Sequence, residues 1–293
     1  MVRIFFALTC VLCLAGKAYS QQDSVSPSGQ VDSTFAGPLT VSFQRNVESP
    51  TISGGYAIGI PHRDGLLQTP DGTPGWYVSI GSESIRTVAG TSLKSLRRNV
   101  FEFQTISIPD SPTQIGETPQ SSRFGLWSIS PTASYGLGYA LGDEGIIALT
   151  HGGGSVWGRI RAQAATPVDR QRVDDFGSAI RFGEKSTAGI NVKVARNIGI
   201  DVEGTWELMY PRHLVLQWAT SQLIEGLGDV AAMAFIRSVL QSSPDLAPVV
   251  YFIIRNGVAA GFKALRSRQM TWPFSSDAPA SVVGFRAGVT FAF

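Results

Sequence analysis

The sequence predicts an all-β fold, a closed antiparallel up-and-down transmembrane β-barrel of about 8–12 strands with a helical insertion before the last strand. Three observations predict it. Extended segments alternate apolar with small or charged side chains, the 293 residues include 32 glycines, and the chain ends on an alternating aromatic segment. Successive side chains of a strand point to opposite faces. A membrane barrel turns the apolar face toward lipid and the polar face toward its lumen.

The last stretch, residues 282–293, shows this alternation most clearly. One face carries Val283, Phe285, Ala287, Val289, Phe291 and Phe293, and the other carries Gly284, Arg286, Gly288, Thr290 and Ala292. This ending resembles the closing strand of the Gram-negative outer-membrane β-barrel superfamily, with OmpA-type and porin-like small barrels as the nearest comparison. The resemblance implies a place in the cell outer membrane. It also implies that Phe285, Val289, Phe291 and Phe293 form the signal read by the barrel-insertion machinery.

The N-terminus predicts a secretory signal peptide over residues 1–20. A positive start at Arg3 precedes an apolar run over 4–14, and small residues stand at Ala18 and Ser20. The run is too short to favour the alternative, a permanent membrane anchor. We expect a flexible lead-in over 21–37 and a barrel domain over 38–293.

The predicted mature chain contains no cysteine, because Cys10 and Cys13 lie in the signal peptide. A disulfide framework, a thiolate metal site and a cysteine nucleophile are thereby excluded. Removal of Arg3 and Lys17 lowers the basic count from 24 to 22, against 22 acidic residues. This neutral balance argues against a nucleic-acid partner.

Alternation predicts the strands of the first half, with turn-rich composition between them. The predicted strands are 39–43, 52–60, 76–80, 99–108 and 124–139, and the predicted loops are 61–74 and 108–122. The strand over 124–139 is the clearest, with aromatic residues near both ends of its apolar face, where two membrane–water interfaces would select them. Pro131 lacks a backbone donor, so we expect a bulge or a break there.

The second half predicts strands over 145–150 and 155–165 around a turn at His151–Gly154, followed by a charged loop over 167–177. Residues 187–208 form the best predicted pair of adjacent strands, and the turn between them at Arg196-Asn197 is very tight, as periplasmic barrel turns are.

Charged residues on the polar faces predict a network inside the lumen. An unpaired charge in a dry soluble core costs several kcal/mol, whereas a narrow polar lumen lets acids and bases pair. The residues expected in the network are Arg159, Arg161, Lys193, Asp201, Glu203, Glu207 and Arg286. The alternative is a two-layer soluble sheet with this face in water.

Helical spacing replaces alternation in an insert over 211–270. It predicts helices over His213–Gln241 and from Pro248 to about Arg268, with a break at Pro244–Pro248. Because the turn at Arg196-Asn197 is periplasmic, the insert leaves the barrel on the extracellular side. We expect it to cap the mouth, enter the lumen or lie on the outer leaflet, and it is a possible surface for a partner. The alternative is a hydrophobic cluster that only seals the barrel.

The residues indicate little chemistry. His62, His151 and His213 do not cluster with metal-ligand spacing, and no serine stands in a nucleophile elbow. We therefore predict no catalytic, metal or cofactor site. The expected role is structural or interaction-based, or passive passage of small solutes, with outer-membrane lipid as a partner. The alternatives are an outer-membrane lipid-modifying enzyme that uses His62 or His213, and a secreted soluble β-sandwich that binds a ligand.

Overall fold

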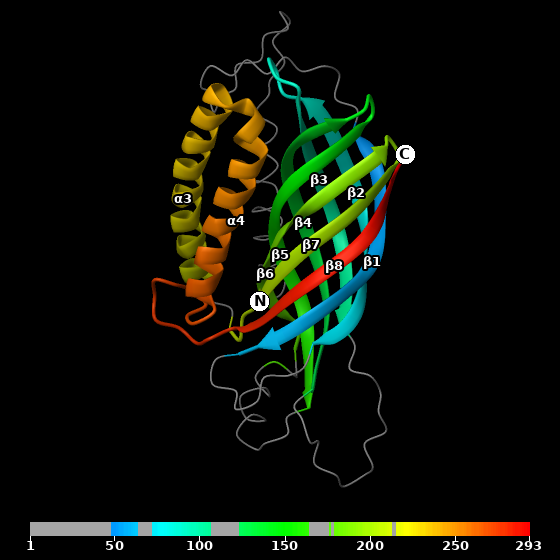
Figure 1. The fold of residues 1–293 in the computed structure, drawn as a ribbon. Coiled ribbons are helices and arrows are strands. Elements are labelled where there is room, and N and C mark those ends of the chain that lie inside the picture. The colour runs from blue at the N-terminus through cyan, green and yellow to red at the C-terminus, as the bar shows by residue number, and fades with distance from the viewer. Residues whose placement is uncertain (1–47, 64–71, 107–122, 164–175, 177–178, 213–214) are drawn as a thin grey trace, which may run out of the picture. The chain divides into compact units, whose positions relative to one another are not determined.

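Eight antiparallel strands close into a barrel in the computed structural model, which describes residues 48–63, 72–106, 123–163, 176, 179–212 and 215–293. All of these lie in one compact unit, residues 44–293. The strands are β1 Ser49–His62, β2 Thr73–Thr87, β3 Leu93–Ile106, β4 Arg123–Leu141, β5 Gly145–Gln163, β6 Arg181–Ala195, β7 Ile198–Met209 and β8 Ala280–Ala292. Each pairs with the next, and β1 pairs with β8, which closes the barrel (Figure 1).

The strand number lies at the low end of the predicted range. The predicted strands 145–150 and 155–165 form the single strand β5, so the turn predicted at His151–Gly154 is wrong. The predicted signal peptide 1–20, lead-in 21–37 and strand 39–43 lie outside the described residues. The tight turn at Arg196-Asn197 is confirmed, because β6 ends at Ala195 and β7 begins at Ile198.

The glycines of β5 allow close approach between strands rather than a turn. A Cβ atom on Gly152 would lie 2.6 Å from Thr187 Oγ1, and one on Gly154 would lie 2.0 Å from the carbonyl oxygen of Pro131. Only glycine fits such positions without displacing a neighbour. The ladder between β4 and β5 pairs Ile129 with Trp157 and then Thr132 with Gly154, so it skips Pro131 as expected.

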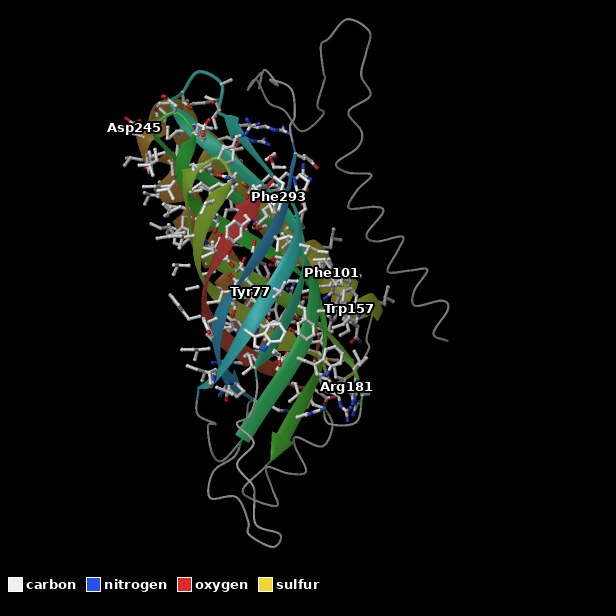
Figure 2. All side chains as sticks on the ribbon, turned by 90° about the vertical axis from the view of Figure 1, so that its right-hand side faces the viewer. Tyr77, Phe101, Trp157, Arg181, Asp245 and Phe293 are labelled. Carbon is white, nitrogen blue, oxygen red and sulfur yellow. The ribbon has the colours of Figure 1, made fainter. Side chains whose placement is uncertain are left out.

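Large apolar side chains cover the outside of the barrel, and small or polar ones point inward. Tyr56 is 82% exposed, Phe285 63% and Ile80 57%, whereas the inward Ser53 and Thr290 are buried. Figure 2 shows the labelled Phe101 and Phe293 among these outer side chains. A soluble β-sandwich would bury its phenylalanines between two sheets. That alternative is wrong, because the sheet closes on itself and its phenylalanines are exposed.

The insert forms two helices, α3 Val215–Ser242 and α4 Ala247–Arg266, joined by the short helix η1 Pro244–Leu246. Both predicted helices and the break between them are confirmed. The pair, here called the hairpin, lies along the outer wall beside β4, β5 and β6 (Figure 1). It therefore neither caps the mouth nor enters the lumen. Taken alone, none of the described helices has both the length and the apolar character needed to cross a bilayer.

Candidate functional site

Charged side chains fill the middle of the barrel lumen. They come from the inward faces of β2, β3, β6, β7 and β8, and each is no more than 7% exposed. The residues are Glu83, Arg98, Glu102, Lys185, Lys193, Asp201, Glu203, Glu207 and Arg286. Their alternation with apolar outward neighbours puts them inside. The candidate site is therefore the lumen itself, with polar groups from many strands converging on one axis.

The first cluster joins Glu83, Arg98, Lys193 and Asp201. Arg98 lies 3.3 Å from Glu83 and 2.9 Å from Asp201, and Lys193 pairs with Glu83. Asp201 also accepts hydrogen bonds from Asn191, at 2.5 Å, and from Thr290. Because Lys193 lies two residues before the end of β6, this cluster sits toward the end of the barrel that carries the tight turns.

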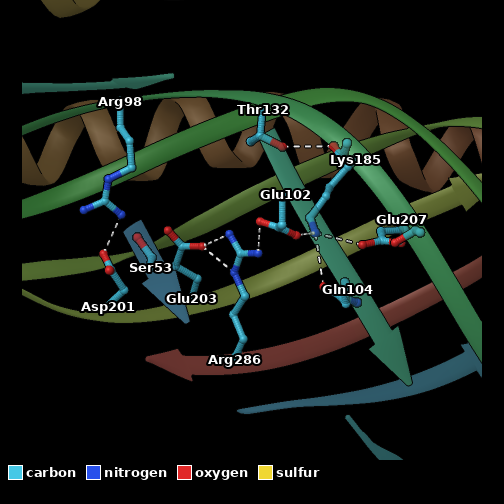
Figure 3. A network of polar contacts seen from close by, with 12 residues as sticks. Ser53, Arg98, Glu102, Gln104, Thr132, Lys185, Asp201, Glu203, Glu207 and Arg286 are labelled. Carbon is cyan, nitrogen blue, oxygen red and sulfur yellow. Dashed lines mark hydrogen bonds and ion pairs between the residues drawn. The ribbon is translucent and has the colours of Figure 1, made fainter. Parts of the chain in front are cut away.

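The second cluster joins Glu102, Lys185, Glu203, Glu207 and Arg286 (Figure 3). Lys185 lies 2.5 Å from Glu102 and 2.8 Å from Glu207, and Arg286 pairs with both Glu102 and Glu203. Glu102 therefore bridges two cations. The guanidinium of Arg286 also lies 4.6 Å from the centre of the Tyr77 ring, a cation–π contact.

The charged side chains of both clusters are paired with one another. Removing a charge from water costs several kcal/mol, and pairing repays that cost only where the geometry is good and further hydrogen bonds form. Here Ser128 donates to Glu207 and Gln104 accepts from Lys185, at 3.4 and 3.2 Å. Loss of one partner would leave a buried charge without compensation, at a cost of about 3–5 kcal/mol.

Apolar layers close the described lumen on both sides of the clusters. One layer, near the tight turns, consists of Leu96, Ile146 and Ala148. The other, toward the opposite end, consists of Ile106, Leu126, Val156, Ile160, Phe176, Met209, Ala280 and Val282. The cavity between the two clusters has a volume of about 20 Å³. That volume holds a water molecule or two, so this cavity has no room for a larger solute.

The structure brings together five of the seven residues predicted for the network: Lys193, Asp201, Glu203, Glu207 and Arg286. Arg159 and Arg161 are elsewhere. They alternate on the same face of β5 as Trp157 and point outward, and Arg161 is exposed. At this level the inner face of β5 belongs to the apolar layer through Val156 and Ile160, which leaves no polar place for an arginine. The prediction for these two residues is wrong.

The sequence reasoning missed four members of the network, Glu83, Arg98, Glu102 and Lys185. Glu102 had a readable signal, because it stands between Phe101 and Phe103 in the sequence. A charge between two aromatic residues, in a strand with an apolar outer face, has to point inward. Glu83 continues the inward row of Tyr77, Ser79 and Gly81 in the same way.

Two of the three histidines, His62 and His151, lie in the described residues. Nδ1 of His151 lies 2.9 Å from Oδ1 of Asn256 in α4, so His151 faces the hairpin. Ser281 donates to the backbone oxygen of His62, not to its ring. His213 lies outside the described residues. Within the described ranges, no group of three His, Cys, Asp or Glu side chains could hold a metal ion.

The fold and its two faces define a class. In a bilayer every backbone polar group needs a partner within the protein, so among β structures only a closed barrel can span it. This barrel is closed, apolar outside and charged inside, and its strand number is even. It has the architecture of a transmembrane β-barrel.

Comparison with solved structures finds small barrel proteins at low similarity. Neisserial surface protein A is 10% identical with a TM-score of 0.38, covering 83% of this chain and 97% of that one. Ail, the attachment invasion locus protein of Yersinia pestis, is 10% identical with a TM-score of 0.32, covering 84% and 99%. Ail in complex with the heparin analogue sucrose octasulfate is 11% identical, with a TM-score of 0.33 and the same coverage. No protein-family model and no curated protein matches the sequence. The role has to be argued from this chain's own residues.

Proposed function

We propose that this protein is a closed, non-conducting outer-membrane barrel with a structural or interaction role and no enzymatic activity. The observation that carries the proposal is the filled lumen, in which two ion clusters lie between two apolar layers. A barrel of about eight strands has an interior that side chains can fill completely. The lumen then stabilises the barrel and does not transport.

The filled lumen argues against passive passage of solutes. A hydrated ion would have to separate pairs such as Lys185 with Glu102 and Arg98 with Asp201, all buried. Each broken pair would cost about 3–5 kcal/mol. The ion would then meet Ile146 or Val156, both 0% exposed, in the apolar layers. The described residues thus oppose conduction at three successive levels.

The connections between strands support an interaction role on one side. At one end the strands are joined by the short segments 88–92, 142–144 and 196–197, and at the other by the longer segments 63–72, 107–122 and 164–180. Outer-membrane barrels have short periplasmic turns and longer extracellular loops. The longer segments therefore belong to the cell exterior, where a partner would meet them. The hairpin begins and ends on that side.

Planar-bilayer conductance of the refolded protein tests the proposal. We expect no stepwise conductance from the wild-type barrel. A matched pair of variants checks that the assay responds to the lumen: Lys185→Ala removes a buried cation, whereas Arg161→Ala removes an exposed one. Reproducible single-channel steps from folded wild-type protein would refute the closed-barrel proposal.

A further inference from the structure

The hairpin follows the barrel wall from one end to the other. At its tip, Tyr139 Oη donates to the backbone oxygen of Asp245 at 2.6 Å, near the β4–β5 turn. At mid-height, Asn256 Nδ2 donates to the backbone oxygen of Thr150 at 3.3 Å. At the far end, Lys263 lies 2.8 Å from Glu184, close to the start of β6. Figure 2 shows Asp245 toward the barrel end that carries Phe293, and Arg181 toward the opposite end.

The height of the hairpin matches the thickness of a membrane. An α-helix rises about 1.5 Å per residue, so the 20 residues of α4 span about 30 Å. The hydrocarbon core of a bilayer is also about 30 Å thick. Because the hairpin is fastened to the barrel at three heights, a barrel that spans the membrane places the hairpin at the same depth.

The hairpin turns an apolar surface away from the barrel. The most exposed of these side chains are Leu216, Leu223, Leu227, Val230 and Phe235 in α3 and Ile253 in α4, at 55–81%. None of the six charged residues within α3 and α4 is exposed. A water-facing helix pair would show the reverse arrangement, with its charges outside. The outer face of the hairpin therefore has the chemistry of the bare barrel wall.

The charges of the hairpin are paired on its inner side. Arg255 lies 2.5 Å from Asp229, which links the two helices. Arg266 lies 2.5 Å from Glu225 and 3.0 Å from Glu184, and Lys263 pairs with Glu184 as well. Gln222 donates to Glu184 at 2.6 Å. Five of these six charged side chains thus have a partner. The sixth, Arg237, lies within two turns of the end of α3, where a long side chain can extend to the membrane–water interface.

The covered wall would be unsuited to lipid without the hairpin. Glu184 lies on the outward face of β6, yet it is only 5% exposed because the helices cover it. His151 and Ser155 occupy outward positions in β5. The outward positions of β1 and β8 instead carry apolar residues such as Ile58 and Phe285. An uncovered carboxylate at membrane depth is costly. The hairpin covers these polar groups and restores an apolar surface over them.

We propose that the hairpin lies within the hydrocarbon layer beside the barrel, with lipid acyl chains against the outer faces of α3 and α4. This inference rests on the proposed membrane-spanning barrel. Neither helix is apolar enough to cross a bilayer alone, because its sequence includes the charges that β6 and the other helix neutralise. The barrel is therefore the partner that makes the hairpin membrane-compatible. The hydrophobic belt is continuous across the hairpin, and membrane lipid is its occupant.

Spin labels on the full chain, with Cys10 and Cys13 replaced by serine, test this in phosphatidylcholine vesicles. Leu227→Cys and Ile253→Cys place labels on the outer faces of α3 and α4, Phe285→Cys marks the bare barrel wall and Arg268→Cys marks the aqueous side. The measurement is collision with oxygen, which enters lipid, and with a water-soluble nickel chelate. We expect labels at 227 and 253 to match 285, with a several-fold higher oxygen-to-nickel ratio than at 268.

The other outcomes separate this inference from the proposed function. If the label at position 285 contacts lipid and the labels at positions 227 and 253 contact water, the proposal of a membrane-embedded hairpin is overturned and the barrel assignment stays intact. Water contact at 285 as well would overturn both. Protection of 227 and 253 from both reagents would show that protein, such as a second copy of the chain, covers the hairpin, and would also overturn the lipid assignment. All four substitutions are at exposed positions, so folding is expected to survive them.

Discussion

Two walls of the barrel present an apolar outer surface in different ways. The wall of β8, β1 and β2 presents Phe285, Ile58 and Trp76 directly to the outside, at 45–63% exposure. The wall of β4, β5 and β6 presents His151 and Glu184 and is covered by the hairpin. One wall meets its surroundings with its own side chains, and the other meets them through two helices. The comparison teaches that an outward strand position need not be apolar if another element supplies the apolar surface.

The largest expected effect lies inside the barrel, which both walls share. Arg286→Ala would leave Glu102 with Lys185 alone and Glu203 without its cation, so we expect a loss of about 3–5 kcal/mol in the free energy of unfolding. Urea unfolding in vesicles, followed by tryptophan fluorescence, measures it. The matched control is Arg161→Ala, which removes an exposed arginine and should change stability by less than about 0.5 kcal/mol. Equal losses for the two variants would contradict the assignment of the network.

A charge placed on the middle of each wall compares the walls directly. Phe285 lies near the middle of β8 and Leu227 near the middle of α3. An arginine at the bilayer midplane of a barrel costs about 2–4 kcal/mol, and we expect this loss for Phe285→Arg and for Leu227→Arg. Urea unfolding in vesicles measures both. A loss of stability for Phe285→Arg with none for Leu227→Arg would mean that the hairpin lies in water. The two walls would then not both face lipid.

The next effect concerns the attachment of the hairpin. Glu184→Ala would leave Lys263 and Arg266 without their shared carboxylate, although Arg266 keeps Glu225. We expect a loss of about 2 kcal/mol, because Lys263 loses its carboxylate partner while Arg266 keeps Glu225. Faster proteolysis within α3 and α4, with the barrel still intact by heat-modifiable gel mobility, would show detachment. Ser186→Ala, on the same face of β6, is the matched control, and an equal effect there would argue against a specific role of Glu184.

The smallest expected effect is at mid-height of the covered wall. Asn256→Ala removes the contact with His151 and the hydrogen bond to the backbone of Thr150. A hydrogen bond contributes about 1 kcal/mol net, so we expect a loss of about 1–2 kcal/mol. Hydrogen exchange of the α4 amides should rise while that of the β8 amides stays unchanged. A uniform rise across both would contradict a contact confined to this wall.

Local patterns in the sequence predicted most of the fold. Alternation located the strands, and helical spacing located α3 and α4 with the break between them. Gly152 and Gly154 were misinterpreted because their reason is tertiary: they make room for Thr187 and Pro131 on neighbouring strands. A local pattern shows that a glycine is needed without showing whether a turn or a close approach needs it.

The candidate site was predictable in part for the same reason. Alternation assigned Lys193, Asp201 and Glu203 to the lumen, because charges opposite apolar residues have to face inward in a barrel. Arg159 and Arg161 share the outward face of β5 with Trp157, and the inner face at this level belongs to the apolar layer. The placement of the hairpin depends on pairs such as Lys263 with Glu184, which are 79 positions apart in numbering and show no local pattern. Contacts of that kind require the folded structure.

The central claim is that hydrocarbon contacts the outward side chains of the bare wall and the outer face of the hairpin, while the side chains inside the lumen are sealed from it. Intermolecular nuclear Overhauser effects between methyl groups and lipid acyl chains, measured in nanodiscs, test it most directly. The account predicts acyl-chain contacts for Ile58, Val289 and Ile253, which are exposed, and none for Ile146, Val156 and Ile160, which are buried in the lumen. Acyl-chain contacts at the lumen methyl groups, or their absence at the outward ones, would contradict it.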